Sequence, residues 1–372
     1  MSRVTKICCV FNFPSHYNYA VYQAMGEELG CDFFFFDNIY QNIKAFDTSK
    51  LTGFKKNIHT KKVGLKSFLW HTGIGPIFNR NYTHYIISGS SAYLVNWLIL
   101  LWCWLTGKKV YMWCHGFHSP VKSKRGRLVA KFFFAHADGL LLYNSYFAPN
   151  MIDIGCDPLK IHYIHNSLDT KLQSEIYKSL SPSSKYQEHF GNNDPVVIYI
   201  GRIQKWKRLD LLINAVDILN NSAKKVNLVI VGGVTDDDTL GELVSRLGLD
   251  NKVWFYGASY DESENGQLLY DAAVCVCPQQ VGLTSIHSLS YGTPCITCDN
   301  FENQGPEFEA ITPAATGSFY KDGDVDDLAK HIWRWASVTE EERNEIRQKA
   351  RHTIESEWSV DYQIRLLKKV IN

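Results

Sequence analysis

Short apolar runs alternate with segments of helical periodicity along both halves of the chain, and each apolar run predicts a strand. In the first half these runs are residues 5–13, 31–36, 85–88, 109–114 and 139–143. In the second half they are residues 196–200, 227–231, 253–256, 274–277 and 294–298. Strands joined by helical crossovers indicate parallel sheets. We therefore expect an α/β protein with two Rossmann-like, doubly wound domains.

The domain limits follow from composition. Residues 173–194 are rich in Ser, Asn, Gly and Pro, which is typical of a linker. We therefore predict an N-terminal domain at 1–172 and a C-terminal domain at 195–356. A length of 372 residues suits two domains, and the segment 340–372 has a helical pattern.

Two further apolar stretches bear on the membrane. Residues 93–105 are nearly all apolar, but these 13 residues fall short of the ~20 that cross a bilayer. We expect a helix buried against the sheet there. In 121–135, five Lys/Arg residues run into Phe132, Phe133 and Phe134. Such a segment is either an interfacial membrane helix or an ordinary amphipathic domain helix, and both hypotheses stay open. A second basic and aromatic patch lies between residues 55 and 70.

The formal net charge of +1 conceals two opposed halves. Residues 1–172 hold 19 Lys/Arg and 9 Asp/Glu, which gives +10, and the remainder holds 20 and 29, which gives −9. A basic first half predicts an anionic partner, such as a membrane surface or a pyrophosphate-linked acceptor. Nucleic acid is not expected, since no nucleic-acid-binding motif is present.

Ten cysteines without a signal peptide are typical of a reducing cytosol, so we expect a cytoplasmic protein, peripheral on the inner membrane face. Cys295 and Cys298 form a Cys-x-x-Cys, but they lie in an apolar run. Small buried side chains are favoured there over a zinc site.

The strongest indication of function follows the strand at 196–200. Gly201 ends the apolar run, and Arg202 and Lys207 lie in the next loop. In open α/β sheets, ligands bind at the carboxyl ends of the strands. Two cations at that edge predict an anionic ligand, most simply a diphosphate, although solvated basic loops are also common.

A second segment leads from the strand 274–277 to a helix that begins near Gly282. Apolar residues at 283, 286 and 289 have helical spacing, and Gly292 stops the helix. The free N–H groups of Gly282, Leu283 and Thr284 would receive a phosphate.

Together these motifs resemble the family-4 (group 1) glycosyltransferases, which have the GT-B fold of two Rossmann-like domains facing a cleft. The resemblance is strongest from about residue 160 to 335. The matching positions are Gly201, Arg202, Lys207, Gly282, Glu307, Asn166–Asp169, Val231–Gly233, Gly292–Pro294 and Thr316–Gly317. It implies that the C-terminal domain binds a nucleotide sugar and that 357–372 packs back on the N-terminal domain.

One departure from the family is clear. Gln279 and His287 stand where the family has the two glutamates of a Glu-x7-Glu motif. Both side chains still form hydrogen bonds to hydroxyls, but a negative charge is lost beside the sugar. Two alternatives therefore stay open: a catalytically impaired binding relative that supports a partner enzyme, and an epimerase or phosphorylase of the same architecture.

The resemblance also implies roles for other residues. His115 follows the strand 109–114 and would face the donor sugar as a catalytic residue. Gly233 and Tyr256 would lie near the nucleotide base. Ser15, His16 and His118 are weaker candidates for the acceptor side.

The predicted activity is a retaining hexosyl transfer from a UDP- or GDP-sugar to a glycan or lipid-linked oligosaccharide in surface-polysaccharide synthesis. Arg202 and Lys207 would stabilise the leaving diphosphate without a metal ion or other cofactor.

Overall fold

The computed structural model describes residues 5–37, 44–63, 68–117, 121 and 123–371 of the 372-residue chain. The chain divides into two compact units. Unit 1 comprises Met1–Asp169 and Val360–Asn372, and unit 2 comprises Thr170–Ser359. Each contains a largely parallel sheet between helices, so the predicted α/β fold class is confirmed.

Unit 1 contains an eight-stranded sheet with the order β4-β3-β2-β1-β5-β6-β7-β8. Every pairing is parallel except that of β3 with β4, which is antiparallel. The strands are β1 (Ile7–Phe11), β2 (Asp32–Phe36), β3 (Phe54–Val63), β4 (Phe68–Thr72), β5 (His84–Ser88), β6 (Lys109–Cys114), β7 (Gly139–Leu142) and β8 (Ile161–Tyr163).

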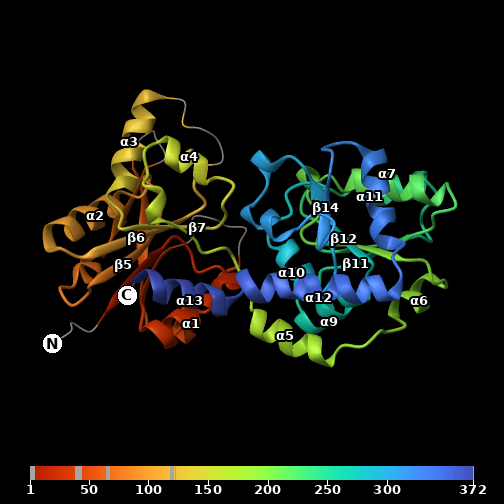
Figure 1. The fold of residues 1–372 in the computed structure, drawn as a ribbon, viewed down its shortest axis with the longest axis horizontal. Helices are drawn as coiled ribbons and strands as arrows, with labels where there is room; N and C mark the ends of the chain where they lie inside the picture. The colour runs from red at the N-terminus through yellow and green to blue at the C-terminus, as the bar shows by residue number, and fades with distance from the viewer. Residues whose placement is uncertain (1–4, 38–43, 64–67, 118–120, 122, 372) are drawn as a thin grey trace. The chain divides into compact units, whose positions relative to one another are not determined.

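Helices cover both faces of this sheet (Figure 1). One face packs on α1 and α13, and the other on α2, α3 and α4. The helices are α1 (Tyr19–Leu29), α2 (Leu94–Thr106), α3 (Lys124–Ala135), α4 (Ala148–Asp153) and α13 (Val360–Ile371). The Tyr111 hydroxyl donates to the Val370 carbonyl at 3.0 Å, and Lys368 pairs with Glu28 at 2.8 Å. The prediction that the end of the chain packs on the first domain is therefore confirmed.

Unit 2 contains a six-stranded parallel sheet with the order β11-β10-β9-β12-β13-β14. Its strands are β9 (Val196–Ile200), β10 (Asn227–Val231), β11 (Val253–Gly257), β12 (Val274–Val276), β13 (Cys295–Cys298) and β14 (Gly317–Tyr320). Its helices are α5 (Thr170–Ser179), α6 (Lys185–Phe190), α7 (Leu209–Asn220), α8 (Leu240–Arg246), α9 (Glu262–Asp271), α10 (Thr284–Ser290), α11 (Val325–Ala336) and α12 (Glu340–Glu357). Strand β9 is buried at every position, as its unbroken apolar run predicts.

Each sheet has one topological switch point, where consecutive crossovers turn to opposite sides. In unit 1 it lies between β1 and β5, and in unit 2 between β9 and β12. The loops that follow these four strands are where a doubly wound sheet binds ligands.

One sequence-based prediction is wrong, and two segments show features that the sequence did not indicate. Residues 173–194 are not a linker: most of α5 and all of α6 lie there, and Tyr186 is buried in the core of unit 2. The segment around Lys55–Trp70 contains the β3–β4 hairpin, in which lysines hid the strand pattern. Helix α2 packs against the sheet, as predicted, but its other side is exposed, since Trp104 is 72% exposed.

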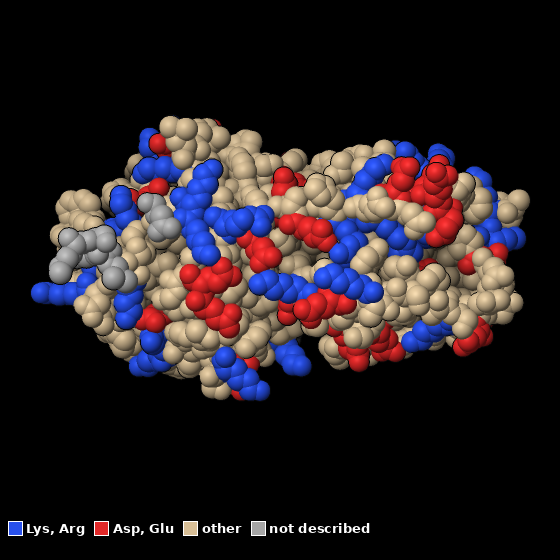
Figure 2. Space-filling model, turned by 60° about the horizontal axis from the view of Figure 1, so that its bottom comes forward, with Lys and Arg blue, Asp and Glu red and all other residues tan. Residues whose placement is uncertain are grey.

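No helix among the described residues has the length and apolar character that a bilayer span requires. On the face of the molecule in Figure 2, Lys/Arg and Asp/Glu side chains are interspersed. The charge excess of the basic half therefore does not form a single-sign patch on this face.

The cysteines of the apolar runs pack inside unit 2. Cys275 and Cys295 are register partners on β12 and β13, and both are fully buried, as is Cys298 at 1% exposure. Burial contributes to raising the pKa of each of these thiols above its ordinary value. They behave as small core side chains.

Unit 1 contains a buried imidazole without a hydrogen-bond partner. His71 on β4 is 1% exposed and stacks on Phe36 with ring centroids 3.7 Å apart. Neither of its ring nitrogens has a partner among the described residues. Burial lowers the pKa of His71 to about 4, against a smaller opposing effect of Asp37. The native state therefore holds His71 neutral.

We predict that this histidine makes stability fall with acidity. The folded state resists protonation down to about pH 4, whereas the unfolded chain takes up a proton near pH 6.5. The contribution of the neutral His71 imidazole to the free energy of unfolding is complete above pH 6.5. It is lost as the pH falls toward 4, by up to roughly 3 kcal/mol at about 1.4 kcal/mol per pKa unit. His71→Phe keeps the ring stacking and should flatten the pH dependence of the melting temperature.

The slope should shrink and not vanish, because burial also lowers the pKa of His84 and His162 in the same unit. Exposed His352 provides the control, and His352→Gln should leave the slope unchanged. An unaltered pH profile in His71→Phe would show that the native imidazole is charged or solvated.

Candidate active site

The switch point of unit 2 is closed by polar contacts between two loops. The Lys207 ammonium group donates to the Gln280 carbonyl, which joins the loop after β9 to the loop after β12. The Thr284 hydroxyl donates to the Ile200 carbonyl at 3.1 Å, which joins the first residue of α10 to the end of β9. The two segments singled out in the sequence are therefore neighbours in space.

Backbone packing explains the glycines of these loops. The Gly201 N–H donates to the Val231 carbonyl at 2.9 Å, so the ends of β9 and β10 stay paired. A Cβ on Gly232 would lie 1.8 Å from the Gly201 carbonyl oxygen, a distance that no side chain tolerates. Gly201 itself has φ of +150°, which strains a larger residue. The loops of β9 and β10 therefore meet backbone to backbone.

The two cations of the loop differ in environment. Lys207 is half-buried at the end of a short 3-10 turn (Lys205–Lys207), 4.3 Å from the Trp206 ring. Burial lowers the pKa of Lys207, the Arg202 guanidinium lowers it further, and Glu307 opposes the shift. Arg202 is exposed, and its guanidinium makes no hydrogen bond or ion pair with any described residue. An anion at this edge would therefore meet one unneutralised and one poorly solvated cation.

Glu307 lies close to the same loops. It is 4% exposed on a 3-10 turn (Pro306–Ala310), and its backbone carbonyl accepts from the Ser285 hydroxyl at 2.8 Å. A Cβ on Gly305 would meet the Glu307 carboxylate at 2.7 Å and the Gly282 Cα at 3.4 Å. The trailing glutamate of the signature thus adjoins the glycine that precedes α10.

Helix α10 begins where the sequence indicated. Gly282 has φ of +53°, and Leu283 is the N-cap of the helix that starts at Thr284. The first N–H groups of a helix have no intrahelical acceptor. Gly292, with φ of +76°, follows its last turn and would force any Cβ against Arg347.

His287, which replaces a family glutamate, is paired with a carboxylate. Its Nε2 lies 3.1 Å from Oε1 of Glu262, the first residue of α9. The same oxygen accepts from the Tyr291 hydroxyl at 2.9 Å and the Gln173 amide at 2.9 Å. Although burial raises the pKa of Glu262, His287 and these donors outweigh burial and lower it. Glu262 therefore keeps a negative charge next to His287, the position at which the family motif has a glutamate.

Gln279, the other replacement, braces a neighbouring loop. Its amide donates to Asp322 at 2.5 Å, and its carbonyl oxygen lies 3.8 Å from the Cys298 sulfur. The backbone carbonyl of Gln279 accepts from the Thr297 hydroxyl at 2.8 Å. The side chain thus ties the segment after β12 to the end of β13 and to the loop after β14.

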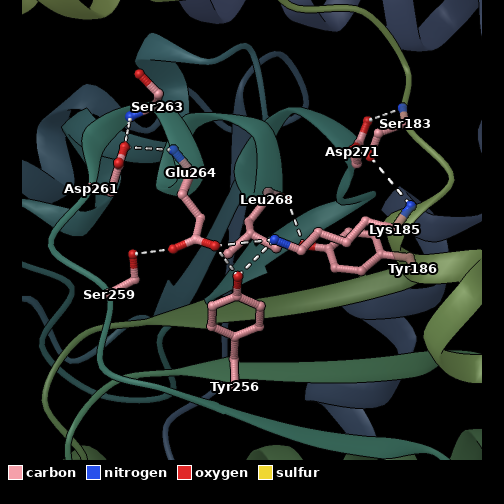
Figure 3. A network of polar contacts seen from close by, with 10 residues as sticks. All are labelled: Ser183, Lys185, Tyr186, Tyr256, Ser259, Asp261, Ser263, Glu264, Leu268 and Asp271. Atoms are coloured by element: carbon pink, nitrogen blue, oxygen red, sulfur yellow. Dashed lines mark hydrogen bonds and ion pairs between the residues drawn. The ribbon is translucent and has the colours of Figure 1, made fainter.

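Of the two residues expected near the nucleotide base, only Gly233 adjoins the basic loop. Its carbonyl accepts from the Ile203 N–H at 3.0 Å. The Tyr256 hydroxyl instead accepts from Lys185 at 2.7 Å and donates to Glu264, in a network that also holds Ser259 (Figure 3). Among the described residues, Tyr256 forms no hydrogen bond with Arg202 or Lys207.

In unit 1, His115 follows β6 at the carboxyl edge of the sheet. Its exposed ring lies 4.6 Å from that of Tyr143, which follows β7. The Asn12 N–H donates to the Ser88 hydroxyl at 3.0 Å, which joins the loop after β1 to the end of β5 at the switch point. His115 therefore occupies the edge that the topology assigns to ligands.

The three acceptor-side candidates have different outcomes. Ser15 is buried, and its hydroxyl accepts from the Asn18 amide at 2.9 Å, so it holds its own loop. His16 is exposed, with Nδ1 3.2 Å from the Lys44 carbonyl. His118 lies outside the described residues.

Sequence reasoning missed the partners that hold these side chains. Glu262 is far in sequence from its partner His287, and Asp322 is far from Gln279. Gln280 binds the distant Lys207 through its backbone carbonyl. No spacing rule reveals contacts of these kinds. One weak signal existed: Asp261 precedes Glu262 as a helix N-cap, which places Glu262 at the start of α9. Among the described residues, no group of three or more His, Cys, Asp or Glu side chains could hold one metal ion.

The chain therefore consists of two Rossmann-like units, the arrangement of the GT-B fold, and the second unit carries cations at its switch point. Residues 182–353 match the family model described as Glycosyl transferases group 1, so the resemblance to this family is confirmed for that segment.

Individual proteins agree with this assignment. The chain is 29% identical over 147 residues to D-inositol 3-phosphate glycosyltransferase of Nocardia farcinica, a match that covers 37% of this chain and 31% of that protein. The match thus spans about a third of that relative's length.

Solved structures resemble the chain over nearly its whole length. HepE from Anabaena in complex with UDP has a TM-score of 0.74 and 17% identity, with 99% of each chain covered. The lipopolysaccharide outer core galactosyltransferase WaaB has a TM-score of 0.66 and 16% identity, again with 99% of each chain covered. At these identities the likeness shows the fold.

We predict that restoring the family glutamate will harm this protein. His287→Glu would set a second carboxylate beside Glu262, where the native pair is attractive, and should cost about 2 kcal/mol of unfolding free energy. Thermal unfolding measures the loss. Glu262→Gln added to His287→Glu removes the like-charge repulsion and should recover stability.

His287→Gln is the matched control, since it loses the pairing without adding charge and should fall between wild type and His287→Glu. A fully stable His287→Glu single variant would mean that Glu262 and His287 do not interact in solution.

Proposed function

We propose that this protein is a glycosyltransferase that moves a hexosyl group from a nucleotide-diphosphate sugar to a glycan or lipid-linked acceptor, with retention of configuration. The observation that supports the proposal is that Lys207 and Thr284 join the loop after β9, which also carries Arg202, to the segment that begins α10 at the switch point of unit 2. A diphosphate fits that edge, because it offers charge to both cations and acceptor oxygens to free N–H groups.

The role of the two cations follows from where charge develops. As the bond between sugar and diphosphate breaks, negative charge accumulates on the leaving phosphate. Arg202 and Lys207 stabilise it, and the poor solvation of Lys207 strengthens its part. In this mechanism the leaving phosphate accepts the acceptor's proton, and the reaction is metal-independent. His115 acts as a hydrogen-bonding catalytic residue toward the donor sugar.

A uridine nucleotide is the first donor to test. HepE was solved with UDP and, in another structure, with UDP-glucose, and it shares the fold of this chain. His287 together with Glu262 replaces the family glutamate as a partner for the ribose hydroxyls, and Gln279 contributes by positioning its loop.

The proposed setting is surface-polysaccharide assembly in the cytoplasm, at the inner face of the membrane. The lipopolysaccharide enzyme WaaB shares the fold, and the basic half of the chain suits an anionic surface or a pyrophosphate-linked acceptor.

A second candidate is an impaired relative that binds a sugar nucleotide without turning it over. Gln279 and His287 in place of two glutamates favour it. The carboxylate that Glu262 brings to His287 favours the enzyme instead.

We predict that Arg202→Ala lowers the rate of sugar transfer by about 100-fold, in the range found for the loss of one charge-stabilising donor. The measurement is the rate at which nucleotide is released from the nucleotide sugar that the wild type uses, in the presence of acceptor. Lys205→Ala is the matched control, because Lys205 is an exposed cation of the same loop and should keep its rate. Wild-type turnover by Arg202→Ala would remove this arginine from the site.

We also predict that UDP raises the melting temperature of the wild-type chain, because a ligand that binds only the native state stabilises it. At about 100 times its Kd the gain is about 2.7 kcal/mol. GDP and CMP are the comparison nucleotides, and Arg202→Ala should shrink the response. If no nucleotide shifts the melting temperature, both the enzyme and the binding relative are excluded.

A further inference from the structure

Helix α2 presents apolar side chains on two sides. Val95, Ile99 and Cys103 are buried in the core of unit 1. On the other side, Leu101, Trp104 and Leu105 are 51%, 72% and 65% exposed. Leu98, one turn earlier, continues the same stripe. A helix that is apolar all round normally lies in a protein core or in lipid.

Helix α3 lies next to α2 (Figure 1), and its exposed apolar side chains extend this surface. Its exposed apolar side chains include Leu128 at 70% and Phe132 at 59%, together with Val129. Trp97 of α2 stacks on Phe132, with ring centroids 6.1 Å apart and an interplanar angle of 15°. The two exposed stripes are therefore adjacent. The α2–α3 face comprises Leu98, Leu101, Trp104, Leu105, Leu128, Val129 and Phe132.

The charged residues of α2 and α3 are all basic. Residues 48–137 contain fourteen Lys/Arg and no Asp or Glu. On α3, Lys124, Arg125 and Lys131 are exposed and form no ion pair with a described residue, whereas Arg127 pairs with Asp153. A protein partner with an apolar patch would account for the leucines. The unneutralised cations, with carboxylates absent over ninety residues, favour a surface that is both apolar and anionic.

The apolar surface continues into a pocket of about 330 Å³. Val129 belongs to the α2–α3 face and also lines the pocket. Phe117, Val121 and Ala130 form further apolar walls, and Arg125 is the cationic residue among those that line the pocket. Phe117 follows His115 by two residues, so the pocket lies toward the carboxyl edge of the sheet in unit 1. Apolar walls with one arginine suit an alkyl chain that ends in a phosphate.

We propose that the α2–α3 face inserts into the interfacial layer of an anionic bilayer, with Lys124, Arg125 and Lys131 on lipid phosphates. Trp104 and Phe132 are the aromatic side chains that such an interface favours, and leucines supply apolar burial. The inference rests on the proposed function in one respect: it makes the acceptor a lipid-linked one, held in the same bilayer.

The test is cosedimentation of the full chain with vesicles of phosphatidylcholine, alone or with about one third phosphatidylglycerol. Wild type should bind the anionic vesicles, more weakly as salt rises. Replacing Trp104 and Leu105 together by Gln should reduce binding at least tenfold, and so should Lys124→Gln with Lys131→Gln. Leu159, 88% exposed in unit 1 and outside the face, is the matched control, and Leu159→Gln should bind as wild type does.

Tryptophan fluorescence distinguishes insertion from surface attraction. Addition of anionic vesicles should shift the emission to shorter wavelength, because Trp104 leaves water. Trp104→Phe should still bind while losing most of that shift.

Three results would overturn the proposal: equal binding by wild type and the Trp104/Leu105 variant, an equal loss in Leu159→Gln, or a wild-type dimer that the variant converts to a monomer without vesicle binding. The last result would assign the face to a second copy. Nucleotide-induced stabilisation, measured on the same variants without vesicles, reports the proposed function separately, so either can fail alone.

Discussion

The donation of Lys207 to the Gln280 carbonyl is the contact on which the candidate site depends. It joins two loops that are some seventy residues apart in the chain and places the cation beside the start of α10. Thr284 and Ile200 form a second connection in the same place. Without these contacts, the loops after β9 and β12 would present Arg202 and the α10 amides separately, and neither alone makes a diphosphate site.

That arrangement has an energetic consequence. An ammonium group that has lost part of its hydration and faces a guanidinium is in a less favourable state than one in water, and the lowered pKa of Lys207 expresses this cost. A bound anion would relieve it. Glu307 offsets part of the same cost within the chain. The candidate site would therefore gain more from a diphosphate than two fully solvated lysines would.

Sequence patterns predicted the parts of the fold that depend on continuous burial. The strands Lys109–Cys114, Val196–Ile200 and Asn227–Val231 have the predicted limits, because their apolar runs reflect burial within a sheet. The β3–β4 hairpin was missed, because an edge hairpin carries lysines along its exposed positions. Glu262 was missed for another reason: its pairing with His287 spans twenty-five residues and exists only once α9 and α10 are packed.

The distribution of charge explains why local geometry must decide ligand binding here. Residues 173–372 carry a net charge of −9, so the long-range field of the C-terminal half repels a nucleotide diphosphate. Binding there requires cations in direct contact, where Coulomb attraction at a few ångströms exceeds a field screened over about 10 Å. The N-terminal half, at +10, has the opposite sign of charge and would attract an anionic surface. A long-range attraction suits a broad surface such as a lipid bilayer, and a short-range one suits a small, doubly charged donor.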